Sequence, residues 1–340
     1  MPADLTTSIW TALACGAVTL LATPRLARAL ANSGVLDIPG PRSNHAAAVP
    51  RGGGMAIVVP VAVAWACVNL NYGAGAFVWS TWAGFVLLMA VSWCDDLRPQ
   101  PVRLRLFVQT LAVVLPLATL PAELRLVPDY LPLIIERVCI GLAWMWFLNA
   151  MNFMDGLDGL ATGQSVTAAG GAFAILAILS QAPFVLVSAP VAAAIAASSL
   201  AFLPFNWPPA RVFLGDAGSV PIGYGIGWLL LLLLLAGQPA AALILPLYFL
   251  CDATGTLIAR LVRGERITQA HSDHLYQRAR RAGKSHTWVT TRALAANILL
   301  AGAAVFSLYS PLEALAAAAV IICALTLAFA ASAMSSRKKT

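Results

Sequence analysis

Four polar side chains at regular intervals separate two strongly apolar stretches of the chain. The stretch NAMNFMDGLDGLA spaces them three residues apart, as Asn149, Asn152, Asp155 and Asp158. Asn and Asp suit recognition of hydroxyl and amide groups, as on a sugar or a base, and can support a metal ion from behind its direct ligands. Three residues turn an ideal helix by about 300°, so a straight helix cannot aim all four at one ligand. We therefore expect either a break at Gly156 and Gly159 or a curved band of side chains around a site.

A pair of adjacent acids, Asp95 and Asp96, ends another apolar stretch. Ionised acids beside apolar surroundings are costly unless they are solvated, paired or bound to a cation. A solvated helix end is the simplest interpretation of such a pair. The functional alternatives are proton transfer and binding of Mg²⁺, which prefers hard oxygen ligands.

A third acid, Asp216, lies between Gly215 and Gly218 in the sequence VFLGDAGS, directly before an apolar helix. Glycine lets backbone N–H groups approach a ligand closely, and the amino end of a helix favours anions. A carboxylate there suits a metal ion that bridges phosphate oxygens, whereas the structural alternative is an ordinary helix cap.

Two histidines, His271 and His274, lie three residues apart in AHSDHLYQR, within the most basic loop of the chain. Histidine can donate a hydrogen bond to phosphate without the fixed charge of lysine. The chain has no H-E-x-x-H sequence, so a zinc protease is not indicated.

The elements that must position these residues are apolar helices. The chain has 340 residues, of which 60% are hydrophobic and only 10% charged, which excludes an ordinary soluble domain. Apolar runs long enough to cross a bilayer recur along the whole length. We predict an all-α polytopic membrane protein with a single domain over residues 1–340 and about eleven spans, at 7–30, 53–70, 74–93, 106–120, 131–148, 166–179, 184–203, 220–235, 239–258, 289–306 and 312–331.

The basic residues give these spans a direction. Of the 21 Lys and Arg residues, only Arg125 and Arg137 fall on the side of the N-terminus, so the opposite side should be cytoplasmic. We expect the N-terminus outside and the C-terminus inside. The first span should not be a cleavable signal peptide, because its basic residues, Arg25 and Arg28, lie near its end and none precedes it. The net charge of +7 then reflects topology first and attraction to anionic lipid second, and it does not indicate nucleic acid.

With these spans, the polar chemistry gathers on the cytoplasmic side. All four histidines and nine of the fourteen acids lie there. Carboxylates for a divalent ion, glycine-rich turns, and arginines and histidines for phosphate indicate a phosphorylated lipid that meets a phosphorylated soluble molecule.

Five motifs in a fixed order resemble one enzyme family. DIPGPRSNH with PRGGG, DDLRPQPVRLR, NAMNFMDGLDGLA, FLGDAGS and AHSDHLYQR are similar to those of the polyprenyl-phosphate N-acetylhexosamine-1-phosphate transferases, over about residues 37–286. The resemblance implies that a polyprenyl phosphate, such as undecaprenyl phosphate, attacks a UDP-N-acetylhexosamine and releases UMP. It also implies Mg²⁺, with Mn²⁺ as a substitute, and a multi-pass protein of the bacterial inner membrane with a cytoplasmic active site. A homodimer is left open.

The resemblance also implies roles for single residues. Asp216 looks like the Mg²⁺ ligand, and Asp95, with Asp96 beside it, looks like the base that deprotonates the lipid phosphate. That phosphate is already largely ionised at neutral pH, so the base is the weaker assignment.

The other assignments concern substrate binding. The four residues of the polar ladder would hold the uridine nucleotide, and His271 and His274 would contact the phosphates or the sugar of the donor. The arginines expected to contact phosphate are Arg51, Arg103 and Arg105, and the alternative explanation for them is the charge bias of the cytoplasmic side.

One departure from the family pattern concerns the donor. Many members carry H-x-H-H in the last loop, whereas HSDH here places Asp273 at the middle histidine. The chain therefore looks closer to the surface-polysaccharide initiators, such as those of O-antigen synthesis, than to the peptidoglycan-precursor branch. Their donors are UDP-N-acetylglucosamine or modified deoxy N-acetylhexosamines.

Two other functions fit the composition. A transporter would use an acid inside the membrane, for which Asp252 is the candidate. A lipid-binding subunit without catalysis would keep the same fold and show no turnover.

Overall fold

The computed structural model describes residues 3–39, 48–179, 185–265 and 273–337. This part of the chain is helical apart from two short strands and the connecting segments. The elements are α1 (Ala3–Asn32), β1 (Leu36–Asp37), β2 (Val49–Pro50), α2 (Met55–Asn71), α3 (Ala76–Leu97), α4 (Val102–Thr119), α5 (Leu133–Phe153), α6 (Leu160–Ile178), α7 (Val185–Asn206), α8 (Asp216–Leu235), α9 (Pro239–Ile244), α10 (Leu247–Val262), α11 (Leu275–Arg281), α12 (His286–Phe306) and α13 (Pro311–Arg337).

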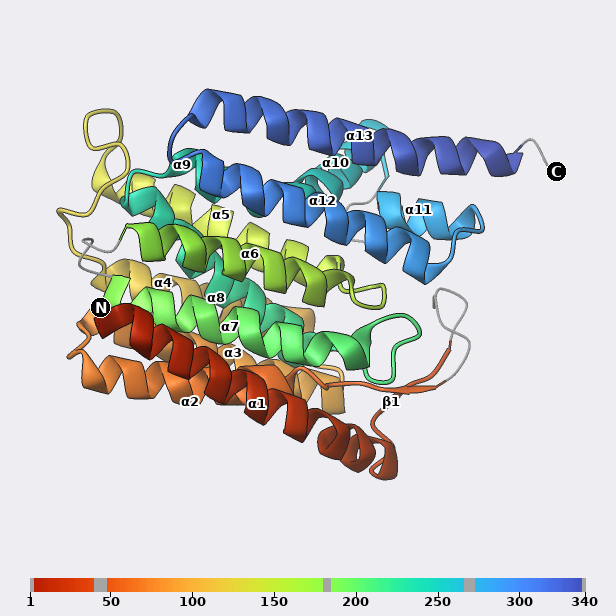
Figure 1. Ribbon diagram of the computed structural model, residues 1–340, viewed down its shortest axis with the longest axis horizontal. Coiled ribbons are helices and arrows are strands. Elements are labelled where there is room, and N and C mark those ends of the chain that lie inside the picture. Colours follow the sequence, from red (N-terminus) through yellow and green to blue (C-terminus); the bar gives the residue numbers. More distant parts are fainter. Residues whose placement is uncertain (1–2, 40–47, 180–184, 266–272, 338–340) are drawn as a thin grey trace.

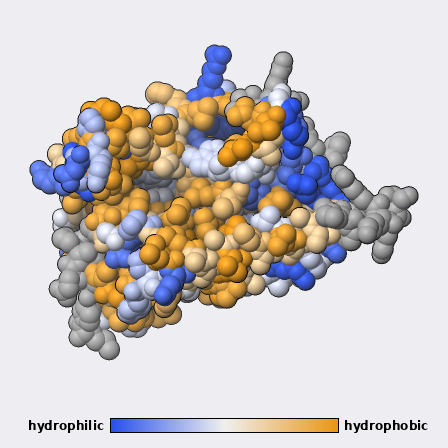
Figure 2. All heavy atoms as spheres, turned by 90° about the horizontal axis from the view of Figure 1, so that it is seen from above, coloured by the Kyte–Doolittle hydropathy of each residue, from blue (hydrophilic) through white to orange (hydrophobic). Residues whose placement is uncertain are grey.

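The long helices form a bundle along the longest axis of the molecule (Figure 1). The first residues of α1 and the last residues of α13 lie at opposite ends of this bundle, and β1 and α11 lie towards the end where α13 finishes (Figure 1). Helix α8 runs through the interior, since 83% of its apolar stretch is buried, against 17% for α1. The side chains exposed around the bundle are largely apolar, as expected for contact with lipid (Figure 2).

The expected polytopic helical architecture is confirmed, with differences at two spans. In the described residues, nine helices are long and apolar enough to cross a membrane. The predicted span at 53–70 is the shorter apolar helix α2. One continuous span over 239–258 is wrong, because the chain breaks into α9 and α10 beside Pro246. Proline lacks an N–H group and its ring clashes with the preceding turn, so a helix commonly stops there.

Aromatic side chains hold α8 in the middle of the bundle. Trp228 stacks on Trp65 of α2 with ring centroids 4.6 Å apart, and Tyr224 stacks on Trp144 of α5 at 4.7 Å. The Tyr224 hydroxyl donates to the carbonyl oxygen of Ala112 at 2.8 Å. Buried aromatic pairs of this kind add to the energy of apolar burial. They fix the helix that begins with Asp216.

A small antiparallel hairpin, which the sequence did not predict, closes one edge of the site. Leu36 of β1 pairs with Pro50 of β2, and Asp37 pairs with Val49. The pairing brings Asp37 and Arg51, which flank a long connection, to the same end of the bundle.

Candidate active site

Two glycine-rich motifs pack backbone against backbone to set up the site. The N–H groups of Gly53 and Gly54 donate to the carbonyl oxygens of Phe213 and Leu214 at 2.9 and 2.8 Å. A Cβ atom on Gly54 would lie only 2.3 Å from the Cα of Gly218, so no larger residue fits without a shift of backbone. The PRGGG and FLGDAGS motifs therefore form one structural unit.

Asp216 is the first residue of α8 and follows Gly215, whose φ of +73° favours glycine. Three side chains from distant parts of the chain converge on its carboxylate. Asn152 donates to Oδ1 at 3.0 Å, Arg51 lies 3.2 Å from the same oxygen, and Arg105 lies 3.3 Å from Oδ2. The loop before α2 and the helices α4, α5 and α8 thus meet at one carboxylate.

The adjacent acids of α3 support this arrangement from behind. The Asp96 carboxylate accepts the N–H groups of Asp216 and Ala217 at 3.1 and 2.9 Å, so it caps the amino end of α8. Arg51 Nε lies 2.7 Å from the same carboxylate, which is fully buried. Asp95 accepts the Gln100 N–H and pairs with Arg105 at 3.0 Å.

Neither acid of this pair lines the two cavities described below. Their oxygens are already occupied by arginine and backbone donors, so the structure gives both a supporting position. A direct action of Asp95 or Asp96 on a substrate stays a prediction.

The polar ladder breaks where its glycines allow it. Helix α5 ends at Phe153, Gly159 has a φ of +72°, and α6 begins at Leu160, so the four side chains do not share one helix. Asn149 donates to Gln109 Oε1 at 3.0 Å, and Asn152 donates to Asp216 and to Ser219. The break at Gly156 and Gly159, one of the two predicted arrangements, is confirmed.

Asp155 and Asp158 lie in the connection between α5 and α6 and have opposite electrostatic environments. Burial, and then the negative charges of Asp216 and Asp96, raise the pKa of Asp155 well above its ordinary value. Burial alone would also raise the pKa of Asp158, but it is lowered by the side chain of His286, whose Nδ1 lies 3.1 Å from Oδ2, and by the N–H of Ala210.

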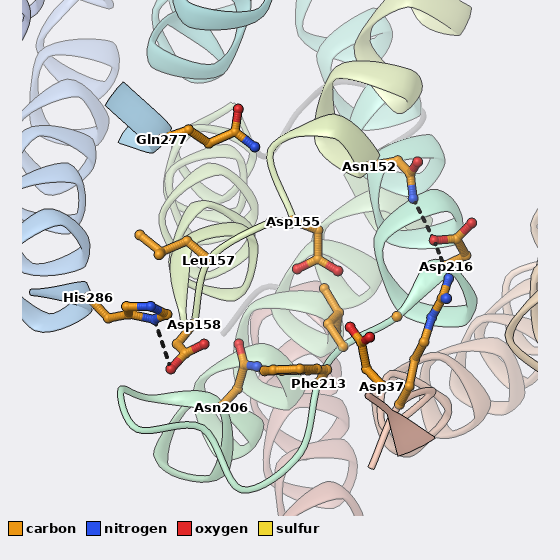
Figure 3. A pocket seen from close by; sticks show the side chains of 14 residues that line it. Asp37, Asn152, Asp155, Leu157, Asp158, Asn206, Phe213, Asp216, Gln277 and His286 are labelled. Carbon is orange, nitrogen blue, oxygen red and sulfur yellow. Dashed lines mark hydrogen bonds and ion pairs between the residues drawn. The ribbon is translucent and has the colours of Figure 1, made fainter. Parts of the chain in front are cut away.

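A polar cavity of about 350 Å³ collects these groups. Figure 3 shows the Asp158–His286 pair on one side of it and the Asn152–Asp216 pair on the other, with Asp155 between them. Its charged and titratable lining consists of Asp37, Arg51, Asp155, Asp158, Asp216 and His286, and its amides are Asn152, Asn206 and Gln277.

A second cavity of about 620 Å³ is also lined by Asp216. We call it the apolar cavity, because its lining is mainly aliphatic and aromatic, with side chains such as Leu88, Val91, Leu106 and Phe153. Its polar lining includes Arg105, Asn149 and His274. Three residues line both cavities, namely Asn152, Asp216 and Gln277.

The structure places the other predicted residues as follows. His274 lines the apolar cavity, whereas Arg103 is exposed on α4 and lines neither cavity. His271 lies outside the described residues. The sequence did not single out Asp37, Asn206, Gln277 or His286 as site residues, although Asp37 stands inside the DIPGP motif.

The donor set around Asp216 fits a magnesium ion of a particular kind. Within the described ranges, no group of three or more His, Cys, Asp or Glu side chains could hold a metal ion by itself. Mg²⁺, however, is commonly held by one or two carboxylates together with water and substrate phosphates. An aspartate on the wall shared by two cavities, with an amide from Asn152 beside it, suits such an ion better than a closed protein cage.

Comparisons with known proteins agree with these motifs. The sequence model of glycosyl transferase family 4 matches residues 78–234. A Bacillus subtilis (strain 168) protein named probable undecaprenyl-phosphate N-acetylglucosaminyl 1-phosphate transferase is 29% identical over 279 residues, which are 78% of this chain and 75% of that protein.

Relatives named phospho-N-acetylmuramoyl-pentapeptide-transferase match over shorter stretches. The one from Lactobacillus delbrueckii subsp. bulgaricus is 40% identical over 112 residues, 33% of each chain. The one from Chlamydia trachomatis serovar D is 33% identical over 184 residues, 46% of this chain and 54% of its own. The wider match to the Bacillus protein is consistent with the initiating branch that the last loop indicated. The chain is thus similar to glycosyl transferase family 4 over residues 78–234, and to the Bacillus protein over 78% of its length.

Proposed function

We propose that this protein transfers N-acetylhexosamine 1-phosphate from a UDP-sugar to undecaprenyl phosphate and releases UMP. The observation that carries the proposal is the position of Asp216, on the wall shared by a polar and an apolar cavity. Such a wall lets one carboxylate serve two phosphorylated substrates of opposite solubility. The name of the Bacillus relative supports undecaprenyl phosphate as acceptor and N-acetylglucosamine as the sugar.

The polar cavity is the site we assign to the nucleotide-sugar. Its amides and carboxylates offer both donors and acceptors, which a base, a ribose and a sugar require. Asn206 is held in place there, because its side chain accepts the Gly159 N–H at 3.1 Å and donates to the Val212 carbonyl at 3.0 Å. Groups fixed in this way can orient a ligand without a further loss of entropy.

The apolar cavity is the site we assign to the lipid phosphate. Its aliphatic walls suit the first isoprene units, while Arg105 and His274 suit the phosphate. Arg105 also contacts Asp95 and Asp216, so its guanidinium lies at the boundary between the two cavities.

The reaction then needs little covalent chemistry from the protein. An oxygen of the acceptor phosphate attacks the phosphorus that carries the sugar, and the bond from that phosphorus to the oxygen of UMP breaks. Catalysis of this kind consists mainly of positioning and charge stabilisation. Because the acceptor is already ionised, no strong base is required, in agreement with the supporting positions of Asp95 and Asp96.

We propose Mg²⁺ as the cofactor, with Mn²⁺ as a substitute. Asp216 would hold the ion, which supplies neutralisation of the charge that builds up on the transferred phosphoryl group. Arg51 and Arg105 now bridge the three carboxylates near that position, so each would have to yield part of its contact with Asp216.

The setting we propose is the bacterial inner membrane, with the site at its cytoplasmic face and the product entering O-antigen or another surface glycan. The site lies at the end of the bundle near α11 and the C-terminal end of α13, where the sequence concentrates its basic residues (Figure 1). A homodimer stays a prediction, which light scattering of the purified protein in detergent tests.

A transporter is less well supported, because its candidate acid holds a helix that contributes to the site. Asp252 is buried and accepts the N–H of Leu275 at the start of α11, the helix that carries Gln277. A catalytically silent lipid-binding subunit would not require a polar cavity that is also lined by Asp216.

The test is UMP release by purified protein with undecaprenyl phosphate, Mg²⁺ and a panel of UDP-sugars. We expect release with a UDP-N-acetylhexosamine, formation of the lipid-linked sugar, and loss of both in Asp216→Ala. Absence of release from the folded wild-type protein with every donor, or full release by Asp216→Ala, would contradict the proposal.

A further inference from the structure

Asp252 is a deeply buried carboxylate to which the reaction described above gives no direct task. It lies in α10 and is 1% exposed. Its Oδ1 accepts the N–H of Leu275 at 2.9 Å and the hydroxyl of Thr256 at 3.2 Å. Its Oδ2 has no hydrogen-bond partner among the described residues. A buried carboxylate is costly to maintain, and a neutral side chain could accept the same two hydrogen bonds.

The imidazole of His274 is the neighbour that distinguishes a carboxylate from such a neutral side chain. Its Nδ1 lies 3.4 Å from Asp252 Oδ1, and its ring stacks on Tyr276 with centroids 5.7 Å apart and planes 9° from parallel. A separation of this size suits an ion pair, and contacts of this kind commonly tighten when substrate binds.

Tyr276 in turn ties this pair to the polar ladder. It is fully buried, and its hydroxyl donates to the carbonyl oxygen of Phe153, the last residue of α5. A Cβ atom on Gly156 would lie 2.4 Å from that hydroxyl, so the approach is close. The ring of His274 thus stacks on Tyr276, and its Nδ1 lies 3.4 Å from Oδ1 of Asp252.

The other end of the imidazole belongs to the active site. His274 lines the apolar cavity together with Arg105, Asn152 and Asp216. The two ring nitrogens point in different directions, so Nε2 lies on the side of the ring away from Asp252. A carboxylate at Nδ1 favours the tautomer with a proton on that nitrogen, and it stabilises the imidazolium if the ring is protonated.

We propose that Asp252 is a positioning residue, which acts through His274 by fixing its ring and its Nδ1 proton so that Nε2 meets a substrate phosphate. This inference rests on the proposed function for the identity of that phosphate. The tautomer and protonation state inferred for the His274 imidazole do not depend on the proposed function.

A double-mutant cycle tests the inference through activity. Asp252→Asn keeps an oxygen for Leu275 and removes the charge, so we expect kcat to fall by about 10- to 100-fold while the KM for the UDP-sugar changes little. In a His274→Gln background the same substitution should change kcat less than about twofold. Thr256→Val, which removes another bond to the same oxygen, is the matched control and should stay within about threefold of wild type. Equal losses from Asp252→Asn in both backgrounds would overturn the inference.

Nitrogen NMR of the histidines tests it without turnover. The chain has four histidines, so ¹⁵N-histidine labelling gives few signals, and His274→Gln assigns the one of interest. We expect the wild-type His274 to carry its proton on Nδ1, alone or as the imidazolium, and Asp252→Asn to shift it towards the Nε2–H tautomer. An unchanged His274 spectrum in a folded Asp252→Asn protein would overturn the inference even if UMP release confirms the proposed function. If the wild type releases no UMP, the proposed function fails while this measurement still decides the state of the pair.

Discussion

Two carboxylates at different places in the bundle, Glu136 and Asp216, show how burial alone differs from a site. Glu136 lies in the first turn of α5 and is 2% exposed. It accepts the N–H groups of Leu126 and Val127 at 2.8 and 3.4 Å and pairs with Arg125 at 3.1 Å. All its partners come from one loop within eleven residues of it, so it fastens that loop to its helix.

Asp216 has partners of a different origin. Arg51, Arg105 and Asn152 lie 165, 111 and 64 residues away in the sequence, and each comes from a separate element. Its carboxylate also borders the polar and the apolar cavity, whereas Glu136 lines neither of them. An acid satisfied by its own loop stabilises the fold, while an acid shared by distant elements and open to cavities can serve a ligand.

The largest expected effect comes from removal of the shared acid. Asp216→Ala should lower UMP release by about 1000-fold or more, since it removes the charge that would hold the cation between two phosphates. Thermal unfolding in detergent should shift little, because Arg51 and Arg105 keep Asp96 and Asp95 as partners. Steady-state rates and melting curves of the same preparation check both parts. A large drop in stability would show that Asp216, like Glu136, mainly stabilises the fold.

Asp96→Asn should give an intermediate result. The amide offers one acceptor oxygen, so one of the two N–H groups of Asp216 and Ala217 loses its partner. Arg51 also loses its negatively charged partner at this position. We expect UMP release to fall by about 10- to 100-fold and stability to fall as well, by about 1–3 kcal/mol. Chemical denaturation alongside the rate assay separates the two losses. A loss of rate with unchanged stability would indicate that Asp96 acts directly on a substrate.

Glu136→Gln should lower the stability of the fold and leave the activity unchanged. It leaves Arg125 without its charged partner, so the protein should lose about 3 kcal/mol of stability. Turnover per folded molecule should stay within about twofold of wild type. The check is denaturant unfolding together with active-site titration, and a selective loss of turnover would contradict it.

The smallest effect concerns the pH dependence of stability at Asp158. Burial acts to raise the pKa of Asp158 in the folded state, but the contact with His286 outweighs it. The pKa is therefore lowered. A lowered carboxyl pKa stabilises the fold at pH values above the unfolded pKa of about 3.9, and this contribution is lost as the pH falls through the lower folded value. Wild type should therefore exceed Asp158→Asn in melting temperature at pH 5–6, and the gap should close below about pH 4. A gap independent of pH would show that the charge of Asp158 does not matter.

The sequence predicted the polar motifs well because chemistry limits their residue types. The break in the ladder followed from Gly156 and Gly159, and the position of Asp216 at the start of an apolar helix followed from its sequence context. The helical spans followed from apolar length, except near Pro246, where average hydropathy hides a local backbone clash.

The tertiary partners could not be predicted in this way. Nothing local in DDLRPQ shows that Asp96 caps a helix 120 residues away, or that His286 pairs with Asp158. Arg103 and Arg105 stand two residues apart and look alike in sequence, yet only Arg105 reaches the carboxylates. Which way each helix turns its faces is decided by packing across the whole bundle.

The central claim is that one cation at Asp216 meets phosphates from both cavities, and electron–nuclear double resonance with Mn²⁺ in place of Mg²⁺ tests it most directly. We predict a ³¹P coupling after addition of the UDP-sugar, a further ³¹P coupling after addition of undecaprenyl phosphate under conditions that prevent turnover, and loss of both in Asp216→Ala. Couplings that persist in Asp216→Ala, or a bound Mn²⁺ that never shows the acceptor phosphate, would contradict the account.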